Sequence, residues 1–296
     1  MSDIATKALF QFRDAENIPS AIKWTGSKRS QACRIAQLAP SFERYIEPFL
    51  GGGAIMFLAA HPGAVGSDIY KPLVELWQTI RDEPDTLIGQ YEQQWLELNA
   101  ELDGIDSSTM TRGNGVPSVF YQARDRFNKS PNPIDLNFLM RTCVNGIVRF
   151  NDRGEFNNSF HLSRRGMQPN RFGKAVKTWS RVLQGVHLVC RDYRDVLQDT
   201  KRGDFVYFDP PYAGNKQRYA ESLTPEELFQ ELEKLNVKGV KWALSYDGTR
   251  GDLDLTHDVP KDLFKVRHFI HSGNSTVKKV LSGKVERVEE TLYLNY

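Results

Sequence analysis

The sequence predicts an α/β protein with a mixed sheet and helices on both faces, and three observations support this. First, short apolar stretches at residues 44–53, 64–68 and 204–209 end on a carboxylate or a glycine, as buried strands often do. Second, helical patterns lie between strands, which is typical of a sheet covered on two sides. Third, residues 79–185 break this alternation, which indicates an inserted, mainly helical domain.

Seven segments read as strands. They are, in chain order, RYIEPFLGGG (44–53), AVGSD (64–68), VHLVC (186–190), DFVYFD (204–209), KWALSYDG (241–248), LFKVRHFI (263–270) and EETLYLNY (289–296). The clearest helix spans residues 224–235. There Thr224 is the expected N-cap, Pro225 occupies the first turn and Glu227 completes a capping box.

The insertion contains two helical patterns, at residues 88–102 and 117–127, separated by a loop rich in Gly, Ser and Thr. Beyond them, Asp152-Arg153-Gly154 has the composition of a β-hairpin turn. We therefore expect residues 1–78 and 186–296 to form one catalytic sheet domain. Residues 79–185 are expected to form an inserted domain that recognises the target.

Composition restricts the class of protein. With 296 residues, 40% hydrophobic and 26% charged, the chain fits one large globular domain with an insertion. No apolar run reaches membrane-spanning length, and the first twenty residues lack a signal-peptide core. The three cysteines are far apart and the six histidines show no metal-ligand spacing. We expect a cytoplasmic protein with no metal and no membrane partner; the sequence names no protein partner.

Charge is distributed unevenly along a chain whose net charge is only +2. In residues 75–106 acidic residues far outnumber basic ones, whereas residues 141–202 and the C-terminal segment are rich in Arg and Lys. Separated basic segments are consistent with a surface that faces a polyanion such as nucleic acid. Ordinary solvated helix faces would give the same pattern, and charge alone does not separate the two interpretations.

The stretch EPFLGGGAIMF (47–57) has the layout of a ligand loop after a first strand. Glycines at 51–53 would let the backbone approach a ligand closely, and Asp68 at the next strand end could hold ribose hydroxyls. Met56 stands where a dinucleotide fingerprint has its third glycine. A nucleoside ligand without a pyrophosphate therefore fits better, and a purely structural glycine turn is the alternative.

The stretch DFVYFDPPYAG (204–214) ends a strand on Asp209 and then places Pro210, Pro211 and Tyr212 in a stiff loop. An exocyclic amine on a nucleobase is a poor nucleophile because its lone pair is delocalised. Asp209 and the carbonyl of Pro210 could each accept one N–H, which aims the lone pair at an electrophilic methyl group. Tyr212 could stack on a base that has left the duplex. The alternative is a rigid loop with an aromatic plug.

With these motifs the sequence resembles the Dam-type (α-class) adenine-N6 DNA methyltransferases, which use S-adenosylmethionine (SAM). The motifs, in order, are KWTGSK (23–28), EPFLGGGA (47–54), SDIY (67–70), NGIVRFNDRGEFN (145–157) and DPPYAG (209–214). The resemblance covers residues 21–296 and implies a Rossmann-like, SAM-dependent methyltransferase sheet. It also implies double-stranded DNA as the partner and a flipped adenine as the methyl acceptor.

The resemblance also assigns roles to individual residues. Catalysis is expected from Asp209, Pro210, Pro211 and Tyr212. Contacts to SAM are expected from Trp24, Lys28, Glu47, Phe49, Gly51, Gly53, Asp68, Asp192 and Asp209. Contacts to DNA are expected from Lys23, Asn145, Ile147 and Arg149. Among these, Arg149 is expected to read guanine through O6 and N7, and Asn145 and Ile147 to wedge between base pairs. Lys23 matches a position that touches DNA in the family, and the alternatives for it are a phosphate contact or an ordinary surface lysine.

Departures from the family pattern concern recognition. Val144 replaces an aromatic residue before the Asn-Gly pair, and residues 157–161 differ from the family's usual sequence. We expect the enzyme to recognise a short duplex sequence similar to GATC. The departures affect which exact sequence is recognised. Asp209 argues against N4-cytosine and glutamine methyltransferases, whose loops usually begin with Ser and Asn. The non-enzyme alternative is a DNA-binding module without activity. The intact DPPY motif and the glycine loop argue against it.

Overall fold

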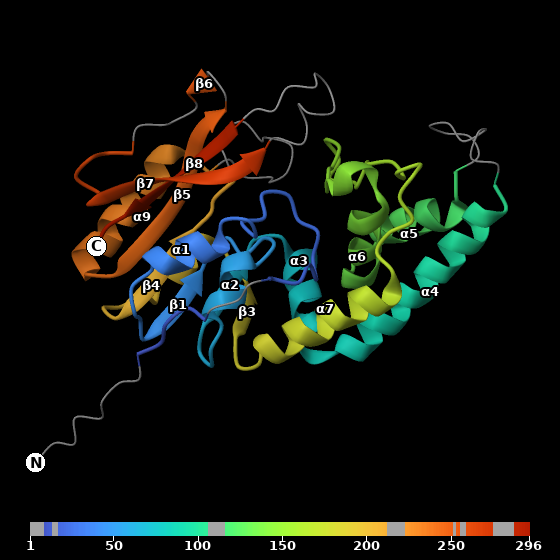
Figure 1. Ribbon diagram of the computed structural model, residues 1–296, viewed down its shortest axis with the longest axis horizontal. Coiled ribbons are helices and arrows are strands. Elements are labelled where there is room, and N and C mark those ends of the chain that lie inside the picture. Colours follow the sequence, from blue (N-terminus) through green and yellow to red (C-terminus); the bar gives the residue numbers. More distant parts are fainter. Residues whose placement is uncertain are drawn as a thin grey trace, which may run out of the picture.

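A computed structural model describes residues 9–13, 17–105, 116–211, 223–250, 253–254, 259–274 and 287–296. Figure 1 shows two parts side by side. One part contains the sheet with its helices, and the other contains α4 to α7. The boundaries at residues 78/79 and 185/186 stay a prediction, and α3 (Lys71–Asp82) crosses the first of them.

The sheet is mixed, as the sequence predicts. Its strands are β1 (Arg44–Glu47), β2 (Val65–Asp68), β3 (His187–Cys190), β4 (Asp204–Phe208), β5 (Lys241–Arg250), β7 (Val266–Asn274) and β8 (Arg287–Leu294). They lie in the order β3-β2-β1-β4-β5-β8-β7, and the short β6 (Leu253–Asp254) pairs with β5. The first five strands are parallel, and β8 is antiparallel to both β5 and β7.

Helices cover both faces of the sheet, because the strands alternate their apolar side chains between two core clusters. On β4, Phe205 and Tyr207 belong to the cluster with α1 (Ala32–Leu38), α2 (Ala54–Ala59) and α3 (Lys71–Asp82). Val206 and Phe208 belong to the cluster with α8 (Tyr193–Gln198) and α9 (Pro225–Lys238). The period of two along β4 thus separates the faces.

The predicted start of α9 is confirmed. The Thr224 side chain accepts a hydrogen bond from the Glu227 N–H, and the Glu227 carboxylate accepts one from the Thr224 N–H. The helix ends at Gly239 in a left-handed conformation, with φ of 68°. This reciprocal capping positions α9 on the sheet face beside α8.

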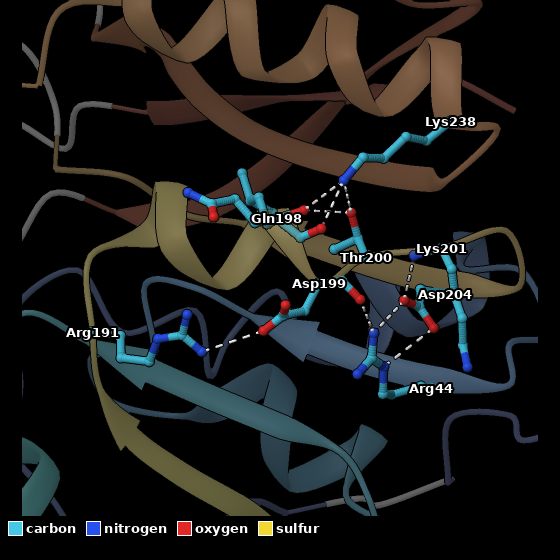
Figure 2. A network of polar contacts seen from close by, with 9 residues as sticks. Arg44, Arg191, Gln198, Asp199, Thr200, Lys201, Asp204 and Lys238 are labelled. Atoms are coloured by element: carbon cyan, nitrogen blue, oxygen red, sulfur yellow. Dashed lines mark hydrogen bonds and ion pairs between the residues drawn. The ribbon is translucent and has the colours of Figure 1, made fainter.

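A polar network joins β1, β4, α8 and α9 at the end of the sheet where β1 and β4 begin (Figure 2). Arg44 lies 2.6 Å from the buried carboxylate of Asp204, and it also donates to the Asp199 carbonyl. Lys238 Nζ donates to the carbonyls of Leu197 and Gln198, at 3.1 and 3.0 Å. A cation at the carboxyl end of α8 satisfies carbonyls that the helix leaves unpaired.

The second part consists of α4 (Pro84–Asp103), α5 (Ser118–Lys129), α6 (Pro133–Thr142), the 3₁₀ turn η1 (Val144–Gly146) and α7 (Pro169–Val182). The predicted helix at 88–102 lies within α4. The predicted helix at 117–127 begins one residue before α5 and otherwise lies within it. Helix α3 packs against α6 and α7. The sheet part and the helical part are therefore joined through α3.

The expected hairpin forms a short antiparallel ribbon after η1. Phe150 bridges to Phe156, the Asn157 N–H donates to the Arg149 carbonyl at 3.0 Å, and the Gly154 N–H donates to the Asn151 carbonyl at 2.9 Å. Gly154 has a φ of 75°, which suits the turn. The ribbon is thus closed at the Asp152-Arg153-Gly154 turn that the sequence indicates.

Candidate active site

A cavity of about 450 Å³ lies at the carboxyl ends of the parallel strands. We name it the glycine-loop cavity, because residues 51–53 form part of its wall. From the central strand β1, the strand order runs through β2 to β3 on one side and through β4 to β5 on the other. The cavity therefore lies at the point where the strand order reverses. Ligands of open α/β sheets bind at such switch points.

The structure brings most of the predicted residues together here. The wall includes Trp24, Lys28, Glu47, Phe49, Gly51, Gly53, Asp68, Asp192, Asp209, Pro210 and Pro211. Tyr212 lies outside the described residues. Lys23, Asn145, Ile147 and Arg149 do not line the cavity; they gather beside the hairpin, as described below. One contiguous wall thus contains residues from five separate parts of the chain.

The glycine loop is held in one conformation by its neighbours. Gly51 and Gly53 have φ of 46° and 64°, where side chains are disfavoured. A Cβ on Gly53 would lie 3.0 Å from the Trp77 ring, and Trp77 Nε1 donates to the Gly51 carbonyl at 2.9 Å. The Gly51 N–H donates to Asp68 at 3.1 Å. The loop therefore presents a fixed, close backbone surface to the cavity.

Asp68 is buried at the end of β2 and accepts backbone N–H bonds from Gly51 and Tyr70. Burial raises its pKa to about 6, and the backbone donors counteract that rise. The carboxylate remains the dominant form at neutral pH. It is therefore an acceptor directed at the cavity, as a ribose contact requires.

Glu47 ends β1 in a buried position and accepts a hydrogen bond from the Tyr45 hydroxyl at 2.9 Å. Burial raises its pKa well above the usual value, against the effect of that hydrogen bond, and the nearby Asp209 raises it further. Glu47 thus favours its neutral form. It contributes a polar group to the wall with little charge.

Asp209 follows β4 and forms an ion pair with Lys28, whose Nζ lies 2.8 Å from Asp209 Oδ1. Burial raises the pKa of Asp209, and the Lys28 ammonium counteracts this effect. The Lys28 side chain is only 4% exposed, so water screens this pair weakly. The ammonium therefore favours the charged form of Asp209, which is the form that can accept an amine N–H.

Sequence reasoning missed one acidic residue at this site. Glu290 on β8 places Oε2 3.3 Å from Lys28 Nζ, so the ammonium that pairs with Asp209 has a second carboxylate within ion-pair distance. Its signal in the sequence is weak. Glu290 alternates with the buried residues Leu292 and Leu294, so it falls on the apolar face of a strand, where a carboxylate is unusual.

Asp192 enters the cavity as the N-cap of α8. Its carboxylate accepts from the Arg194 N–H at 2.8 Å and pairs with the Arg194 guanidinium. The hydrogen bonds from the Arg194 guanidinium lower the pKa of Asp192, and the one from the Arg194 backbone N–H adds to this effect. The Phe49 and Tyr193 rings lie 5.2 Å apart next to it. This corner combines a charged acceptor with aromatic surface, which suits a nucleobase.

The segment that contains Trp24 and Lys28 is tied to the helical part of the molecule. Trp179 Nε1 of α7 donates to the Pro19 carbonyl at 2.8 Å, and the buried Arg141 of α6 donates to the Ala21 carbonyl. Arg29 donates to the Ile18 carbonyl at 2.6 Å. The insertion therefore helps to place one wall of the glycine-loop cavity.

The predicted DNA-contacting residues form a second group beside the hairpin. Asn145 adopts a left-handed backbone with φ of 56°, and the neighbouring Gly146 packs against the Lys23 side chain. Arg149 is exposed, and its Nε donates to Asn157 Oδ1 at 2.8 Å. Ile147 is half-buried. These residues present a polar, cationic ribbon outside the cavity.

Aromatic rings connect the two groups. The ring centroids of Trp24 and Tyr70 are 6.1 Å apart, and those of Tyr70 and Phe150 are 5.5 Å apart. Trp24 borders the glycine-loop cavity and Phe150 belongs to the hairpin. The cavity and the hairpin are therefore in packing contact through Tyr70.

The part of the chain that the structure describes lacks two kinds of feature. It contains no group of three or more His, Cys, Asp or Glu side chains arranged to hold a metal ion. No helix there is both long and apolar enough to cross a membrane.

Comparison with known proteins identifies the family. The model of the D12 class N6 adenine-specific DNA methyltransferases matches residues 24–276. The chain is 30% identical over 251 residues to the type II methyltransferase M.MjaIII of Methanocaldococcus jannaschii, covering 76% of this chain and 82% of that protein. It is 27% identical over 272 residues to the DNA adenine methylase of Escherichia coli strain K12, covering 88% of this chain and 91% of that protein. The chain therefore belongs to the D12 class of N6 adenine-specific DNA methyltransferases and is an enzyme that methylates adenine in DNA.

Proposed function

We propose that this enzyme transfers a methyl group from SAM to N6 of a flipped adenine in a short duplex site similar to GATC. The observation that carries the proposal is the position of Asp209. Its carboxylate and the following Pro210 and Pro211 share one cavity with the glycine loop and Asp68. A carboxylate suited to an amine thus lies beside surfaces suited to a nucleoside.

The glycine-loop cavity has the properties that SAM requires. Its volume of about 450 Å³ falls within the range of sites for small ligands. Asp68 is an acceptor for ribose hydroxyls, Phe49 and Trp24 offer ring faces, and the glycines permit close backbone approach. The acidic wall favours a donor that carries a positive sulfonium. These features support SAM as the methyl donor.

For the acceptor, Asp209 and the Pro210 carbonyl would each accept one N–H of the adenine amine. The lone pair of N6 would then point at the methyl group. As the N6–C bond forms, the C–S bond breaks and its electron pair remains on sulfur. N6 gives up one proton, for which the Asp209 carboxylate is the nearest proposed acceptor. Lys28 keeps that carboxylate charged before the transfer.

For the DNA, the ribbon at residues 145–157 would enter the major groove, and Arg149 would read a guanine. The hydrogen bonds from Arg149 to the side chain and carbonyl of Asn157 support this role, because they fix the guanidinium plane. Lys23, packed on Gly146, would contact DNA beside the ribbon. Asn145 and Ile147 would wedge into the base stack, and the adenine has to leave that stack to reach the cavity.

One assay tests the proposal. Purified protein is incubated with unmethylated duplex DNA and SAM carrying a tritiated methyl group, and the DNA is then digested to nucleosides. We expect the label in N6-methyladenine. Label in N4-methylcytosine would contradict the base assignment, and DNA binding without label would favour an inactive DNA-binding module. Direct sequencing of methylated genomic DNA would then give the site.

A further inference from the structure

The carboxylate of Glu290 stands at the site without a role in the reaction described above. Glu290 lies on β8, which pairs with Gly248 of β5 and Ile270 of β7 at this residue. It is about 80 residues from Asp209 in the sequence. The antiparallel insertion of β8 beside β5 brings its side chain to the Lys28 ammonium.

Lys28 therefore lies between two carboxylates. Its Nζ is 2.8 Å from Asp209 Oδ1 and 3.3 Å from Glu290 Oε2. Glu290 Oε2 is a buried atom that makes no hydrogen bond among the described residues, so the ammonium is its counter-charge, although the side chain as a whole is 21% exposed. Burying a charged oxygen is costly unless an opposite charge balances it. The geometry thus couples the three side chains.

Charge balance gives this arrangement a consequence. One ammonium between two carboxylates leaves the group with one net negative charge, whereas Lys28 and Asp209 alone would be neutral. The SAM sulfonium is positive, and the thioether sulfur of its product S-adenosylhomocysteine is neutral. A negative group beside the cavity therefore favours the donor over the product.

We propose that Glu290 is a positioning residue, which holds the Lys28 ammonium between itself and Asp209 and gives the site the negative charge that favours a cationic methyl donor. This inference rests on the proposed use of SAM. It assigns no contact between Glu290 and the reacting atoms. Glu290 acts on the reaction through its contact with Lys28 and through the electrostatic field of its carboxylate.

The titratable groups around Asp209 distinguish this electrostatic role of Glu290 from a role in packing alone. Among the described residues, the other titratable groups that interact with Asp209 are Glu47 and Tyr45 from β1 and Tyr207 from β4. Burial raises the pKa of each of them well above its usual value, which favours the neutral form. Within the described part of the chain, Lys28 and Glu290 are therefore the charged side chains that act on Asp209.

The test compares Glu290→Gln, which keeps the shape and removes the charge, with Glu233→Gln on the exposed side of α9, which makes the same charge change away from the cavity. Calorimetry without DNA measures the affinities for SAM and for S-adenosylhomocysteine. In Glu290→Gln we expect SAM to bind about tenfold more weakly and the product to change little. In Glu233→Gln both affinities should stay as in the wild type.

A second readout is the pH profile of kcat. The Glu290 charge raises the pKa of Asp209, against the effect of Lys28. Without that charge, and with the ammonium acting on Asp209 alone, the pKa of Asp209 should fall. The acid limb of the profile in Glu290→Gln should therefore move to lower pH. Glu290→Asp, which restores the charge on a shorter side chain, should recover most of the donor preference.

Equal losses for SAM and for its product, together with an unchanged acid limb, would overturn the inference and leave a packing role. If Glu290→Gln does not fold by circular dichroism, Glu290→Ala, which also removes the charge, takes its place and is judged by the same two readouts. Failure of the proposed function is recognised separately. A wild-type protein that binds SAM but does not methylate adenine would contradict the proposed reaction, whereas the donor preference would still be measurable.

Discussion

The Lys23 side chain lies against the Cα of Gly146, so that a Cβ at residue 146 would overlap the Lys23 Cε and Nζ atoms. Burial lowers the pKa of Lys23, and the neighbouring Arg164 lowers it further. This contact joins the segment before the glycine-loop cavity to the start of the hairpin. It ties a candidate DNA-contacting residue to the ribbon that would enter the groove.

Gly146→Ala should therefore displace Lys23. We expect about tenfold weaker binding to the preferred DNA site, with unchanged affinity for SAM, measured by fluorescence anisotropy and calorimetry. Gly154→Ala is the matched control, because Gly154 also has a positive φ, of 75°, but no atom lies within 4 Å of its would-be Cβ. Equal effects of the two substitutions would show that backbone strain, and not Lys23, causes the loss.

Asp209→Ala should abolish methyl transfer, because one of the two proposed amine acceptors disappears. Losses of this kind reach about a hundredfold or more. Asp209→Asn retains an acceptor oxygen but removes the charge that faces Lys28, and it should also be strongly impaired. Tritium transfer measures both, with a thermal melt to establish that each variant folds. Normal turnover in folded Asp209→Ala would refute the proposed mechanism.

The affinity for SAM should depend on pH through Asp68. Its pKa is raised to about 6 by burial, so the carboxylate becomes protonated as the pH falls through that value. A protonated carboxyl is a weaker acceptor for ribose hydroxyls, and we expect SAM to bind more weakly below about pH 6. Calorimetry over a range of pH checks this in the wild type. The same fall in Asp68→Asn would assign the effect to another group.

Arg149→Ala should relax the base preference at one position of the site. A bidentate arginine–guanine pair discriminates between bases by about 1–3 kcal/mol. Asn157→Ala should have a smaller effect in the same direction, because it frees a guanidinium that Asn157 holds at 2.8 Å. Methylation of single-base variants at two salt concentrations measures both. A uniform loss on all sequences, with a reduced salt dependence, would make Arg149 a phosphate contact.

Asp204→Asn should lower the stability of the protein and leave the chemistry unchanged. The Asp204 carboxylate is fully buried and pairs with Arg44 at the end of the sheet away from the cavity (Figure 2). Removing one partner of a buried pair costs about 3 kcal/mol, and partial exposure of Arg44 reduces this cost. Chemical denaturation measures the loss. A reduced kcat at a temperature where the variant is folded would contradict this separation.

Much of the site could be predicted from the sequence because its signals are local. Glu47, Asp68 and Asp209 each end an apolar stretch, and the ends of parallel strands meet at one edge of a sheet. The capping box of Thr224 and Glu227 acts over three residues, so its pattern survives in the structure. Where neighbouring residues determine the conformation, the sequence alone is sufficient.

Glu290 and Gly146 show what only the tertiary structure decided. The position of Glu290 beside Lys28 depends on the antiparallel insertion of β8 between β5 and β7, and strand order is a property of long-range pairing. The contact of Lys23 with Gly146 requires the insertion to fold back on the segment before α1. The sequence by itself indicated the candidate residues for the chemistry and the carboxylates that end or directly follow β1, β2 and β4. Packing between distant segments determined which charges face one another, because Coulomb interactions depend on distances that local patterns do not contain.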